Sequence, residues 1–360
     1  MKVVLLSAAF SIHTARWANG LVSRGVEVHL ISLHENAHVL DSKVYLYKLK
    51  NKAPLGYFSA VFEVRKLLKE IQPDLVNAHY ATGYGLLARL VAFKPVLLSV
   101  WGSDVYDFPE KSVVHRWLLK GNLKSATSIA STSHCMSSKT GETFKHSKVF
   151  ITPFGIDESL FKPLPALEGR GSNKIVLGTV KTLKRKYGID ILIKAFAKTW
   201  YELDKNRDLF LEISGGGPDL NALQQLAKSL GVDKQVVFHG QVDHADVPNI
   251  LNRLDIYCAF SRMDSESFGV AILEASACGK PVIVSDADGP AEVTLDGKTG
   301  LVVPKEDVVA SAEAMIQLIE NEQLRKKMGD AGRQHVLEHY TWEKSLDLMV
   351  EAYRQTMSMR

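Results

Sequence analysis

The sequence predicts an α/β protein with two domains, each built from a parallel β-sheet covered by helices. Two observations lead to this prediction. Short apolar runs rich in β-branched residues alternate with helical patterns, and the alternation occurs twice along the chain. The length of 360 residues also exceeds one ordinary hydrophobic core and fits two domains of about 150 to 200 residues each.

The strand candidates fall into two sets, separated by a segment with two prolines, two glycines and no apolar periodicity at residues 161–173. We therefore predict an N-terminal domain at residues 1–165 and a C-terminal domain at residues 166–341, with a last helix at residues 342–360 crossing back to the first domain. The strand candidates are KVVLLS, VEVHLISL, DLVNAH, PVLLSV, ATSIAS and KVFITP, then KIVLGTV, LFLEIS, QVVFHG, DIYCAF, PVIVSD and GLVV.

Bulk properties exclude several classes of protein. The hydrophobic fraction of 46% and the charged fraction of 23% are close to globular averages. No stretch approaches the roughly 18 apolar residues of a membrane-spanning helix, and we interpret the opening MKVVLLSAAF as a strand with no signal peptide. The cysteines form no CxxC pair, which argues against a zinc site or a disulfide framework (Cys135, Cys258 and Cys278). A cytoplasmic location follows as an expectation.

The net charge of +4 conceals an asymmetry between the two halves. Residues 1–165 hold 20 Lys and Arg against 12 Asp and Glu, so this half carries +8 and the remainder −4. A basic half can serve nucleic acid, an anionic membrane surface or phosphorylated substrates, and composition alone does not choose among them.

The segment at residues 265–292, SESFGVAILEASACGKPVIVSDADGPAE, contains Glu266 and Glu274. Helical spacing from Phe268 to Cys278 predicts a helix that starts just after Glu266. The free N–H groups of Phe268, Gly269 and Val270 then form an anion site that suits a diphosphate. Eight helical steps rise about 12 Å, so one carboxylate could hold a ribose and the other a sugar. The alternative is a surface helix with two solvated glutamates.

This segment resembles the signature of the family 4 retaining glycosyltransferases. Also similar to that family are ITPFGIDESLF, VLGTVKTLKRKYGIDILIKAF, ISGGGPDL, VVFHGQVD and the run from Asp296 to Val303, so the resemblance extends over most of the chain. It implies the B-type glycosyltransferase fold, in which two Rossmann-like domains face each other across a cleft. It also implies that Glu266 contacts the transferred sugar and that Glu274 binds the ribose of the donor. Ser267 in the same segment is a further candidate for donor binding.

The resemblance places two cations, Lys181 and Lys186, on the donor phosphates. Family members usually have Arg at the first position, and Lys keeps its charge but lacks the planar fork. Tyr187 also intervenes before Gly188, where a Lys-Gly pair is commoner. The alternative for this run is a solvated loop.

Two further donor contacts are predicted with less support from the residues themselves. Val242 and its neighbours Asp243 and His244 follow a strand where the resemblance places contacts to the nucleobase. Gly215 in ISGGGPDL lies either in a donor-side turn or in a strand–helix turn tightened by glycines, and both interpretations stay open.

The first half departs from the family pattern at two places. Ala8 and Ala9 stand where many relatives have a pair of glycines, and Trp101 stands where many have a histidine near the sugar, although Gly102 and Asp104 match. An imidazole could come from His13 or His79 instead, while a lone histidine is more often structural. The catalytic candidates are Glu266, Lys181, Lys186, Asp104 and His13.

No cofactor or catalytic metal is expected. SDAD at residues 285–288 has a metal-like spacing, but the resemblance predicts a turn there. GKT at residues 297–299 lacks the upstream glycine of a phosphate loop, and no strand is followed by GxGxxG.

The expected reaction moves a hexose or N-acetylhexosamine, with retention, from a nucleoside-diphosphate sugar to a hydroxyl of a glycan or lipid-linked acceptor. A UDP-sugar is favoured and a GDP-sugar is possible, with no nucleic-acid partner. The alternatives are a sugar-nucleotide epimerase on a related fold and a non-catalytic nucleotide-binding partner subunit.

A basic helix at residues 111–124, KSVVHRWLLKGNLK, suggests a peripheral position at the inner face of an anionic membrane. It combines four cations with aliphatic residues and Trp117, a composition that can lie in a bilayer interface. In the alternative, Val114, Trp117 and Leu118 pack into the sheet and the lysines are merely solvated.

Overall fold

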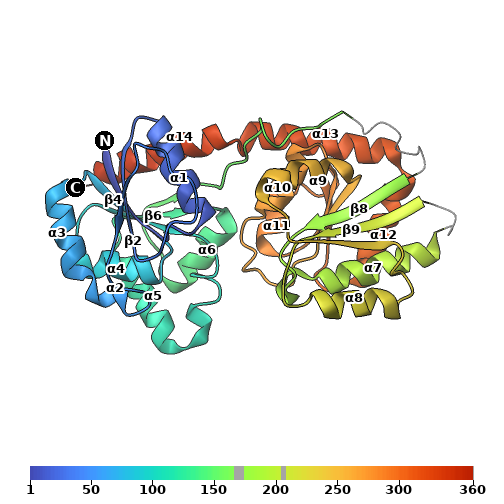
Figure 1. Ribbon diagram of the computed structural model, residues 1–360, viewed down its shortest axis with the longest axis horizontal. Coiled ribbons are helices and arrows are strands. Elements are labelled where there is room, and N and C mark those ends of the chain that lie inside the picture. The colour runs from blue at the N-terminus through green and yellow to red at the C-terminus, as the bar shows by residue number, and fades with distance from the viewer. Residues whose placement is uncertain (166–173, 204–207, 360) are drawn as a thin grey trace. The chain divides into compact units, whose positions relative to one another are not determined.

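The computed structural model describes residues 1–165, 174–203 and 208–359, which form two compact units. The first unit comprises residues 1–153 and 343–359, and the second comprises residues 154–342 (Figure 1). The units thus divide between Pro153 and Phe154, whereas the sequence placed this boundary at residue 165. Most of the predicted linker, residues 166–173, lies outside the described residues.

The sheet of the first unit is entirely parallel, in the order β3-β2-β1-β4-β5-β6-β7. Sequence analysis missed β3, an edge strand that pairs with β2 from His29 opposite Tyr45 to Ser32 opposite Lys48. Its residues are mostly exposed, so it lacks the buried apolar run of a central strand. The strands are β1 Lys2–Leu6, β2 Glu27–Ser32, β3 Tyr45–Lys48, β4 Leu75–His79, β5 Val96–Val100, β6 Ser128–Ser131 and β7 Val149–Ile151.

Helices cover both faces of this sheet. The helices α3, α4 and α5 pack their apolar residues with those of the strands into one core, while α1 and the last helix, α14, lie against the other face (Figure 1). The helices of this unit are α1 Ile12–Ser23, α2 Gly56–Ser59, α3 Val61–Ile71, α4 Gly83–Val91, α5 Val113–Ser125, α6 His134–Thr143 and α14 Trp342–Met357.

The contacts of α14 explain why the end of the chain belongs to the first unit. The Tyr353 hydroxyl donates to Asn77 Oδ1 at 2.8 Å in the buried sheet, and Ser128 and Thr356 share a hydroxyl hydrogen bond of 2.6 Å. At the surface, Arg24 forms ion pairs with Glu343 and Asp347. Buried polar groups pair with partners of matching geometry, so these bonds fix the position of the helix on the sheet.

The second unit repeats the design with the strand order β10-β9-β8-β11-β12-β13, again entirely parallel. The helices α7, α8 and α12 pack together, and α9, α10 and α13 form a second group (Figure 1). The elements are β8 Lys174–Val180, α7 Ile189–Glu202, β9 Asp208–Ser214, α8 Leu220–Ser229, β10 Val236–Gly240, α9 Val247–Arg253, β11 Ile256–Ala259, α10 Val270–Ala277, β12 Val282–Ser285, α11 Asp288–Val293, β13 Gly300–Val303, α12 Val308–Glu320 and α13 Glu322–His339. The α/β class predicted from the alternating pattern is confirmed.

Each sheet reverses its order of strand addition at one point. In the first unit the reversal lies between β1 and β4, and in the second unit it lies between β8 and β11, where Ile256 pairs with Leu177. At such a reversal the loops after the two central strands diverge to opposite faces and leave a crevice at the carboxyl edge. The residues after β8 and β11 therefore lie where a fold of this kind binds its ligand.

The helix α5 does not bury the apolar residues that, in one alternative for residues 111–124, were expected to pack into the sheet. Its contact with the core comes from Leu119, Asn122 and Leu123, all buried. Val114 and Trp117 are 62% and 63% exposed, so they do not pack into the sheet as that alternative required, whereas Leu118 is partly buried. Among the described residues, no helix is long and apolar enough to cross a membrane.

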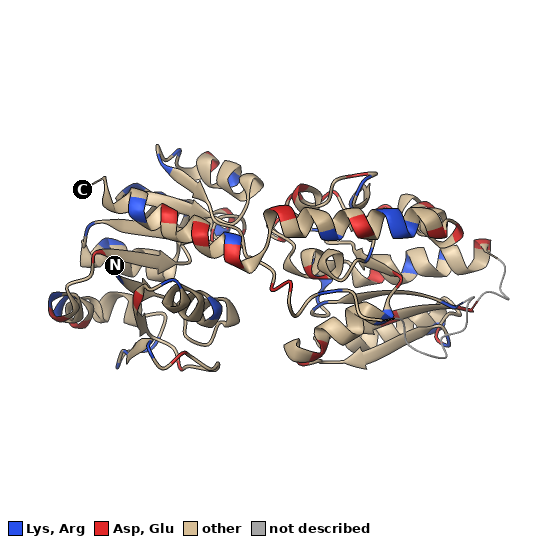
Figure 2. Cartoon of the chain, turned by 90° about the horizontal axis from the view of Figure 1, so that it is seen from above, with Lys and Arg blue, Asp and Glu red and all other residues tan. Residues whose placement is uncertain are grey.

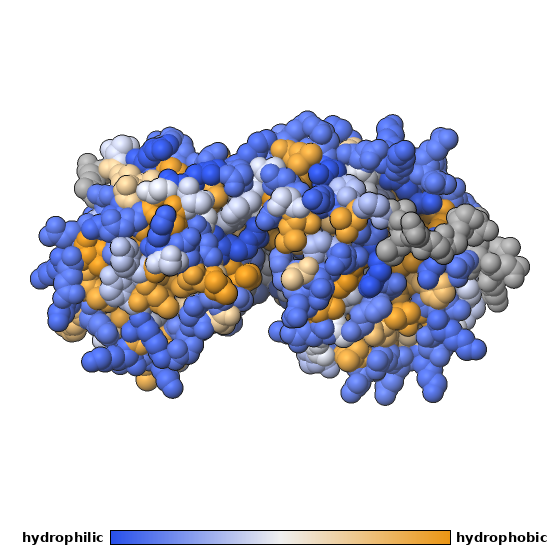
Figure 3. Space-filling model, turned by 45° about the horizontal axis from the view of Figure 1, so that its top comes forward, coloured by the Kyte–Doolittle hydropathy of each residue, from blue (hydrophilic) through white to orange (hydrophobic). Residues whose placement is uncertain are grey.

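The charges and the apolar residues of the surface are both dispersed. Figure 2 shows Lys and Arg interspersed with Asp and Glu over the helices of each unit. On the face shown in Figure 3, hydrophobic residues reach the surface in patches separated by hydrophilic ones. Single exposed apolar residues are normal, so only those that coincide with a cavity or a cluster of charge need a functional explanation.

Candidate active site

An ion pair joins the loops that follow β8 and β11. Lys181 comes directly after β8, and its Nζ lies 2.7 Å from Oε1 of Glu266, in the loop between β11 and α10. Both side chains are mostly buried. The structure therefore brings two of the predicted catalytic residues into contact, and the strand reversal accounts for it because parallel neighbours end at the same edge of a sheet.

The surroundings of Lys181 keep its ammonium charged. Burial opposes the charged form of Lys181, but the adjacent Glu266 carboxylate more than offsets it, and the net result is a raised pKa. The Lys181 side chain is thus already cationic when no ligand is bound.

The Tyr187 ring contacts the ammonium groups of both predicted phosphate-binding lysines. Its ring centroid is 4.7 Å from Nζ of Lys181 and 4.9 Å from Nζ of Lys186. Both distances are within the range of cation–π attraction. Tyr187, which interrupts the usual Lys-Gly pair, therefore holds both ammonium groups against its ring. Sequence analysis did not predict this contact.

Close backbone contacts hold the lysine loop in place. A Cβ at Gly215 would lie 1.9 Å from the Lys181 carbonyl oxygen, and one at Gly188 would lie 1.8 Å from that of Phe260. Gly215 also has a φ of 140°, and its N–H donates to the Gly240 carbonyl. These contacts agree with the packing interpretation of Gly215, because a side chain at this position would collide with the Lys181 backbone, and the predicted donor contact stays a prediction.

Arg262 is a site residue that sequence analysis missed. Its guanidinium makes a bidentate pair with the Asp190 carboxylate at 2.6 and 2.7 Å and donates to the Arg185 carbonyl oxygen, while its backbone N–H donates to the Lys186 carbonyl oxygen. This planar fork locks the lysine loop to the start of α7. Only its position in the sequence could have indicated a role for Arg262 at the site, because it follows β11 and precedes Glu266 by four residues.

The helix α10 starts later than predicted. It begins at Val270, with Gly269 at the N-cap in the left-handed region at φ 93°. Only half of the eight steps from Glu266 to Glu274 are thus helical, and the predicted rise of about 12 Å does not apply. Among the described residues, none accepts a hydrogen bond from the N–H groups of Phe268, Gly269, Val270 and Ala271. These N–H groups are available to an anion, and the anion site at this position stays a prediction, with Ala271 added to the donors that the sequence named.

The loop before α10 is packed tightly from behind. Ser267 and Phe268 are 5% exposed, and the Phe268 ring makes edge contacts with Phe154 and Tyr340. A Cβ at Gly289 would lie 2.2 Å from the Phe268 nitrogen. Ser267 and Phe268 can therefore offer a ligand their backbone, whereas the Phe268 side chain belongs to the core.

Glu274 is also engaged. The buried carboxylate lies on α10, and its Oε1 is 3.1 Å from Nε2 of His244, a half-exposed residue whose ring makes an edge contact with Phe161. Val242 is partly buried in the same loop after β10. The structure thus groups the predicted ribose-binding and base-binding residues, and it adds the His244 contact that the spacing in the sequence could not show.

The metal-like SDAD segment is used for structure. The Asp286 carboxylate accepts from the Lys305 N–H at 2.8 Å, and Asp288 is the first residue of the short helix α11, where a turn was predicted. Among the described residues, no group of three or more His, Cys, Asp or Glu side chains has the geometry of a metal site.

In the first unit, Trp101 lies next to both candidate histidines, with ring centroids 6.1 Å from His13 and 4.6 Å from His79. His79 is buried, and its ring nitrogens bond to Ser7 Oγ and Asn77 Oδ1. Burial lowers the pKa of His79 to about 3, so it stays neutral and structural. His13 is partly exposed at the start of α1 and remains the candidate imidazole.

Asp104 is fully buried, contrary to its predicted catalytic role. Its carboxylate accepts from the N–H groups of Ala81, Trp101 and Gly102. Burial raises the pKa of Asp104 and these hydrogen bonds oppose the rise. A carboxylate that reaches no solvent cannot touch a substrate, so Asp104 is a positioning residue that orders the loop carrying Trp101.

Comparisons with known proteins show which families the chain matches. Residues 164–335 match the family of glycosyl transferases group 1, and residues 2–133 match the family described as glycosyl transferase 4-like. The chain is 25% identical over 344 residues, 90% of its own length and 88% of the relative's, to N-acetyl-alpha-D-glucosaminyl L-malate synthase of Bacillus anthracis. It is 35% identical over 202 residues, about half of each chain, to the GDP-mannose-dependent alpha-(1-6)-phosphatidylinositol monomannoside mannosyltransferase of Mycolicibacterium smegmatis.

Solved structures give the fold independently. Sucrose-phosphate synthase from Thermosynechococcus elongatus superposes with a TM-score of 0.86 over 100% of both chains at 19% identity. Anabaena HepE in complex with UDP and glucose has a TM-score of 0.81, covering 99% of this chain and 100% of that chain, also at 19% identity.

The two Rossmann-like sheets and the lysine loop after β8 are those of a glycosyltransferase of the B-type fold. Together with the two family matches, they place the chain in the group 1 glycosyltransferases, as its resemblance to family 4 predicted.

We expect Tyr187→Leu to weaken the binding of UDP and GDP about five- to thirtyfold. The substitution removes the ring that holds both ammonium groups, a loss of about 1–2 kcal/mol. Tyr187→Phe keeps the ring and should bind as the unsubstituted protein does. Isothermal titration calorimetry measures both, and equal affinity in the Leu and Phe variants would show that the ring has no positioning role.

Proposed function

We propose that the protein transfers a hexose or N-acetylhexosamine, with retention of the anomeric configuration, from a nucleoside-diphosphate sugar to a hydroxyl of a glycan or lipid-linked acceptor. The observation behind this proposal is the junction of Lys181, Glu266 and the unpaired N–H groups that begin α10. It joins a fixed cation and a row of amide donors, which suit a diphosphate, to a carboxylate that suits sugar hydroxyls.

The names of similar proteins support the donor class. HepE was solved with UDP and with UDP-glucose, and the mycobacterial relative is GDP-mannose-dependent. UDP-glucose and GDP-mannose are both nucleoside-diphosphate sugars. We propose a donor of the same class for this chain, with a UDP-sugar favoured. Several relatives are named for acceptors that carry an acid group, namely L-malate, phosphatidylinositol monomannoside and D-inositol 3-phosphate.

The proposed chemistry neutralises charge on a departing diphosphate. The bond between the anomeric carbon and the phosphate oxygen breaks with its electron pair on that oxygen. The acceptor oxygen bonds to the same face of the anomeric carbon, and its proton passes to the leaving phosphate. Lys181, Lys186 and the N–H groups at the start of α10 stabilise the negative charge that develops, and each such donor is worth about 3 kcal/mol.

A panel of UDP- and GDP-sugars with and without acceptors tests the reaction class. Transfer to an acceptor, followed by mass spectrometry, is the expected result. An epimerised donor formed without any acceptor would favour the alternative of a sugar-nucleotide epimerase, and nucleotide binding without turnover of any donor would favour a non-catalytic partner subunit.

We expect Glu274→Gln to weaken donor binding at least tenfold, because a ribose would lose a charged hydrogen-bond acceptor. Glu266→Gln should mainly lower kcat, because its carboxylate contacts the reacting sugar. Calorimetry and steady-state kinetics separate the two effects. Glu322→Gln, at an exposed position on α13, is the control. Affinity and kcat like those of the control in both Glu266→Gln and Glu274→Gln would refute the donor assignment.

Activity is expected to survive chelation, since the proposed charge stabilisation uses protein groups alone. Enzyme treated with EDTA should still transfer sugar at close to its original rate. Complete loss of transfer, restored by added Mn²⁺ or Mg²⁺, would show that a metal carries the charge instead.

We also propose that α5 contacts an anionic membrane. Val113, Val114 and Trp117 are exposed on this helix together with Arg116, Lys120 and Lys124. A cationic side chain also reaches the exposed indole from the neighbouring helix, because the Arg89 guanidinium lies 5.8 Å from the Trp117 ring. Exposed apolar and aromatic residues beside cations are the composition of interfacial helices.

Vesicle co-sedimentation tests this membrane contact. We expect stronger binding to vesicles containing phosphatidylglycerol than to phosphatidylcholine vesicles, weakened by salt, since each cation contributes about 1 kcal/mol. Substituting Trp117, Lys120 and Lys124 together by Ser should abolish the difference. The matched control replaces Val309, Lys326 and Lys327 by Ser at exposed positions of α12 and α13. Equal binding to both vesicle types at low salt would exclude the contact.

A further inference from the structure

A cavity of about 770 Å³ lies at the carboxyl ends of β1, β2 and β3 in the first unit. We call it the strand-edge pocket and define it by Phe10, Leu33, His34, Glu35, Ala37, Lys48, Leu49, Lys50, Lys52 and Ala53. The carboxyl edge is where doubly wound sheets bind their ligands. The pocket depends on β3, the strand that sequence analysis missed.

The charged groups of the pocket are mainly basic. Lys48 forms an ion pair with Glu35, the one acidic side chain of the lining. Lys50 and Lys52 have no ion-pair partner among the described residues. Their two uncompensated ammonium groups follow β3 directly, so they face the same edge of the sheet as the loops after β1 and β2.

A buried hydrogen-bond network fixes the protonation of His34. Ser32 Oγ already accepts from the N–H groups of Ala9 and His34, so its own proton is directed to Tyr84 Oη, 3.3 Å away. Tyr84 Oη also accepts from the Leu33 N–H, and its proton therefore goes to Nδ1 of His34 at 2.9 Å. This assignment places the His34 proton on Nε2.

His34 therefore offers a neutral donor to the pocket. Burial lowers the pKa of His34, which keeps the ring uncharged at neutral pH. Among the described residues, Nε2 has no partner. The half-exposed Phe10 ring packs edge-on against His34 with centroids 5.0 Å apart and adds an apolar surface.

We infer that the strand-edge pocket binds an acidic group, a phosphate or a carboxylate, of the acceptor. This inference rests on the proposed function only in that it identifies the ligand as the acceptor substrate. Lys50, Lys52 and His34 Nε2–H supply donors, and the one carboxylate in the lining is already paired, so a ligand rich in acceptor atoms is the complementary partner. The Phe10 ring suits the carbon skeleton that bears the acid group.

Isothermal titration calorimetry on the full chain tests the pocket with matched probes. Glucose 6-phosphate represents the phosphate, glucuronate the carboxylate, and glucose is the neutral control. We expect at least one acidic probe to bind about tenfold or more tightly than glucose. Substituting Lys50 and Lys52 together by Ser should remove that preference, and substituting both by Arg should retain most of it.

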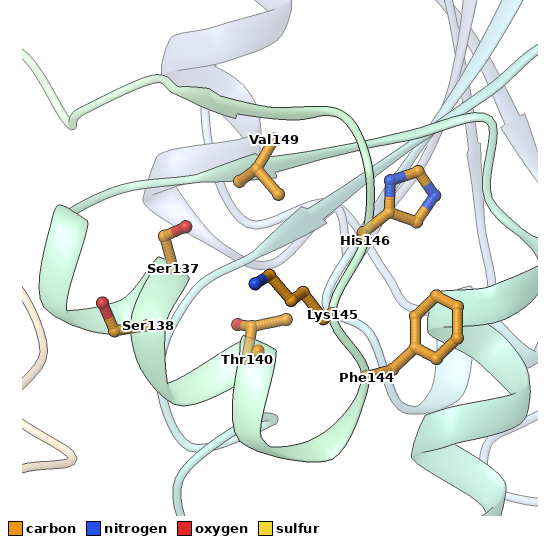
Figure 4. Close-up of a pocket in the computed structure, with 8 residues that line it drawn as sticks. Ser137, Ser138, Thr140, Phe144, Lys145, His146 and Val149 are labelled. Carbon is orange, nitrogen blue, oxygen red and sulfur yellow. The ribbon is translucent and has the colours of Figure 1, made fainter.

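The control variant replaces Lys145 and Lys148 by Ser. These exposed lysines precede β7 at the opposite, amino edge of the sheet. Lys145 borders a different pocket, formed by the end of α6 and the loop to β7 together with Ser137, Ser138 and Thr140 (Figure 4). The control removes the same charge from the same unit and should leave the preference for the acidic probe unchanged.

Three outcomes would overturn the inference. They are equal affinity for acidic and neutral probes, no binding of either acidic probe at concentrations on the order of 10 mM, and an equal loss of affinity in the pocket and control variants. UDP and GDP are titrated in parallel. If the unsubstituted protein binds neither UDP nor GDP, the proposed function is refuted. The comparison of acidic with neutral probes still decides whether the pocket binds anions.

Discussion

The reversal of strand order between β8 and β11 is the constraint on which the candidate active site depends. Two neighbouring parallel strands end at the same edge of the sheet. Lys181, which follows β8, is therefore brought next to the loop that follows β11 by the pairing of these two strands. Other features maintain this meeting. The glycines at 188 and 215 admit backbone carbonyls at distances that no side chain tolerates, and Arg262 ties the lysine loop to α7.

The ion pair between Lys181 and Glu266 is a poor source of stability, because two charges lose most of their hydration for a single mutual contact. The ion pair instead keeps Lys181 charged and in position before a ligand binds. The carboxylate keeps the ammonium charged, and the ring of Tyr187 holds it together with Lys186. An arriving diphosphate then meets cations that are already placed and partly dehydrated, so little reorganisation remains for the bound state.

The sequence predicted the parts of the fold that depend on local pattern. Buried parallel strands appear as continuous apolar runs, whereas the edge strand Tyr45–Lys48 is exposed and alternates too little to be distinguished from a loop. At the candidate site, the family resemblance predicted roles for Lys181, Glu266 and Glu274. It could not show that Asp104 and His79 are buried, or that Arg262 and His244 hold other site residues, because these contacts join segments far apart in the sequence.

The basic charge of the first half also divides in a way that composition could not show. Lys50 and Lys52 follow β3 at the rim of a cavity, while Lys120 and Lys124 lie exposed on α5, away from the strand ends. All four lysines are exposed, so salt screens both clusters. The clusters differ in their surroundings, because Lys50 and Lys52 border a cavity that can enclose one acidic group, whereas Lys120 and Lys124 lie on a helix beside the exposed Trp117. The excess of +8 in the first half can therefore serve both the recognition of one acidic group and the attraction to an anionic surface.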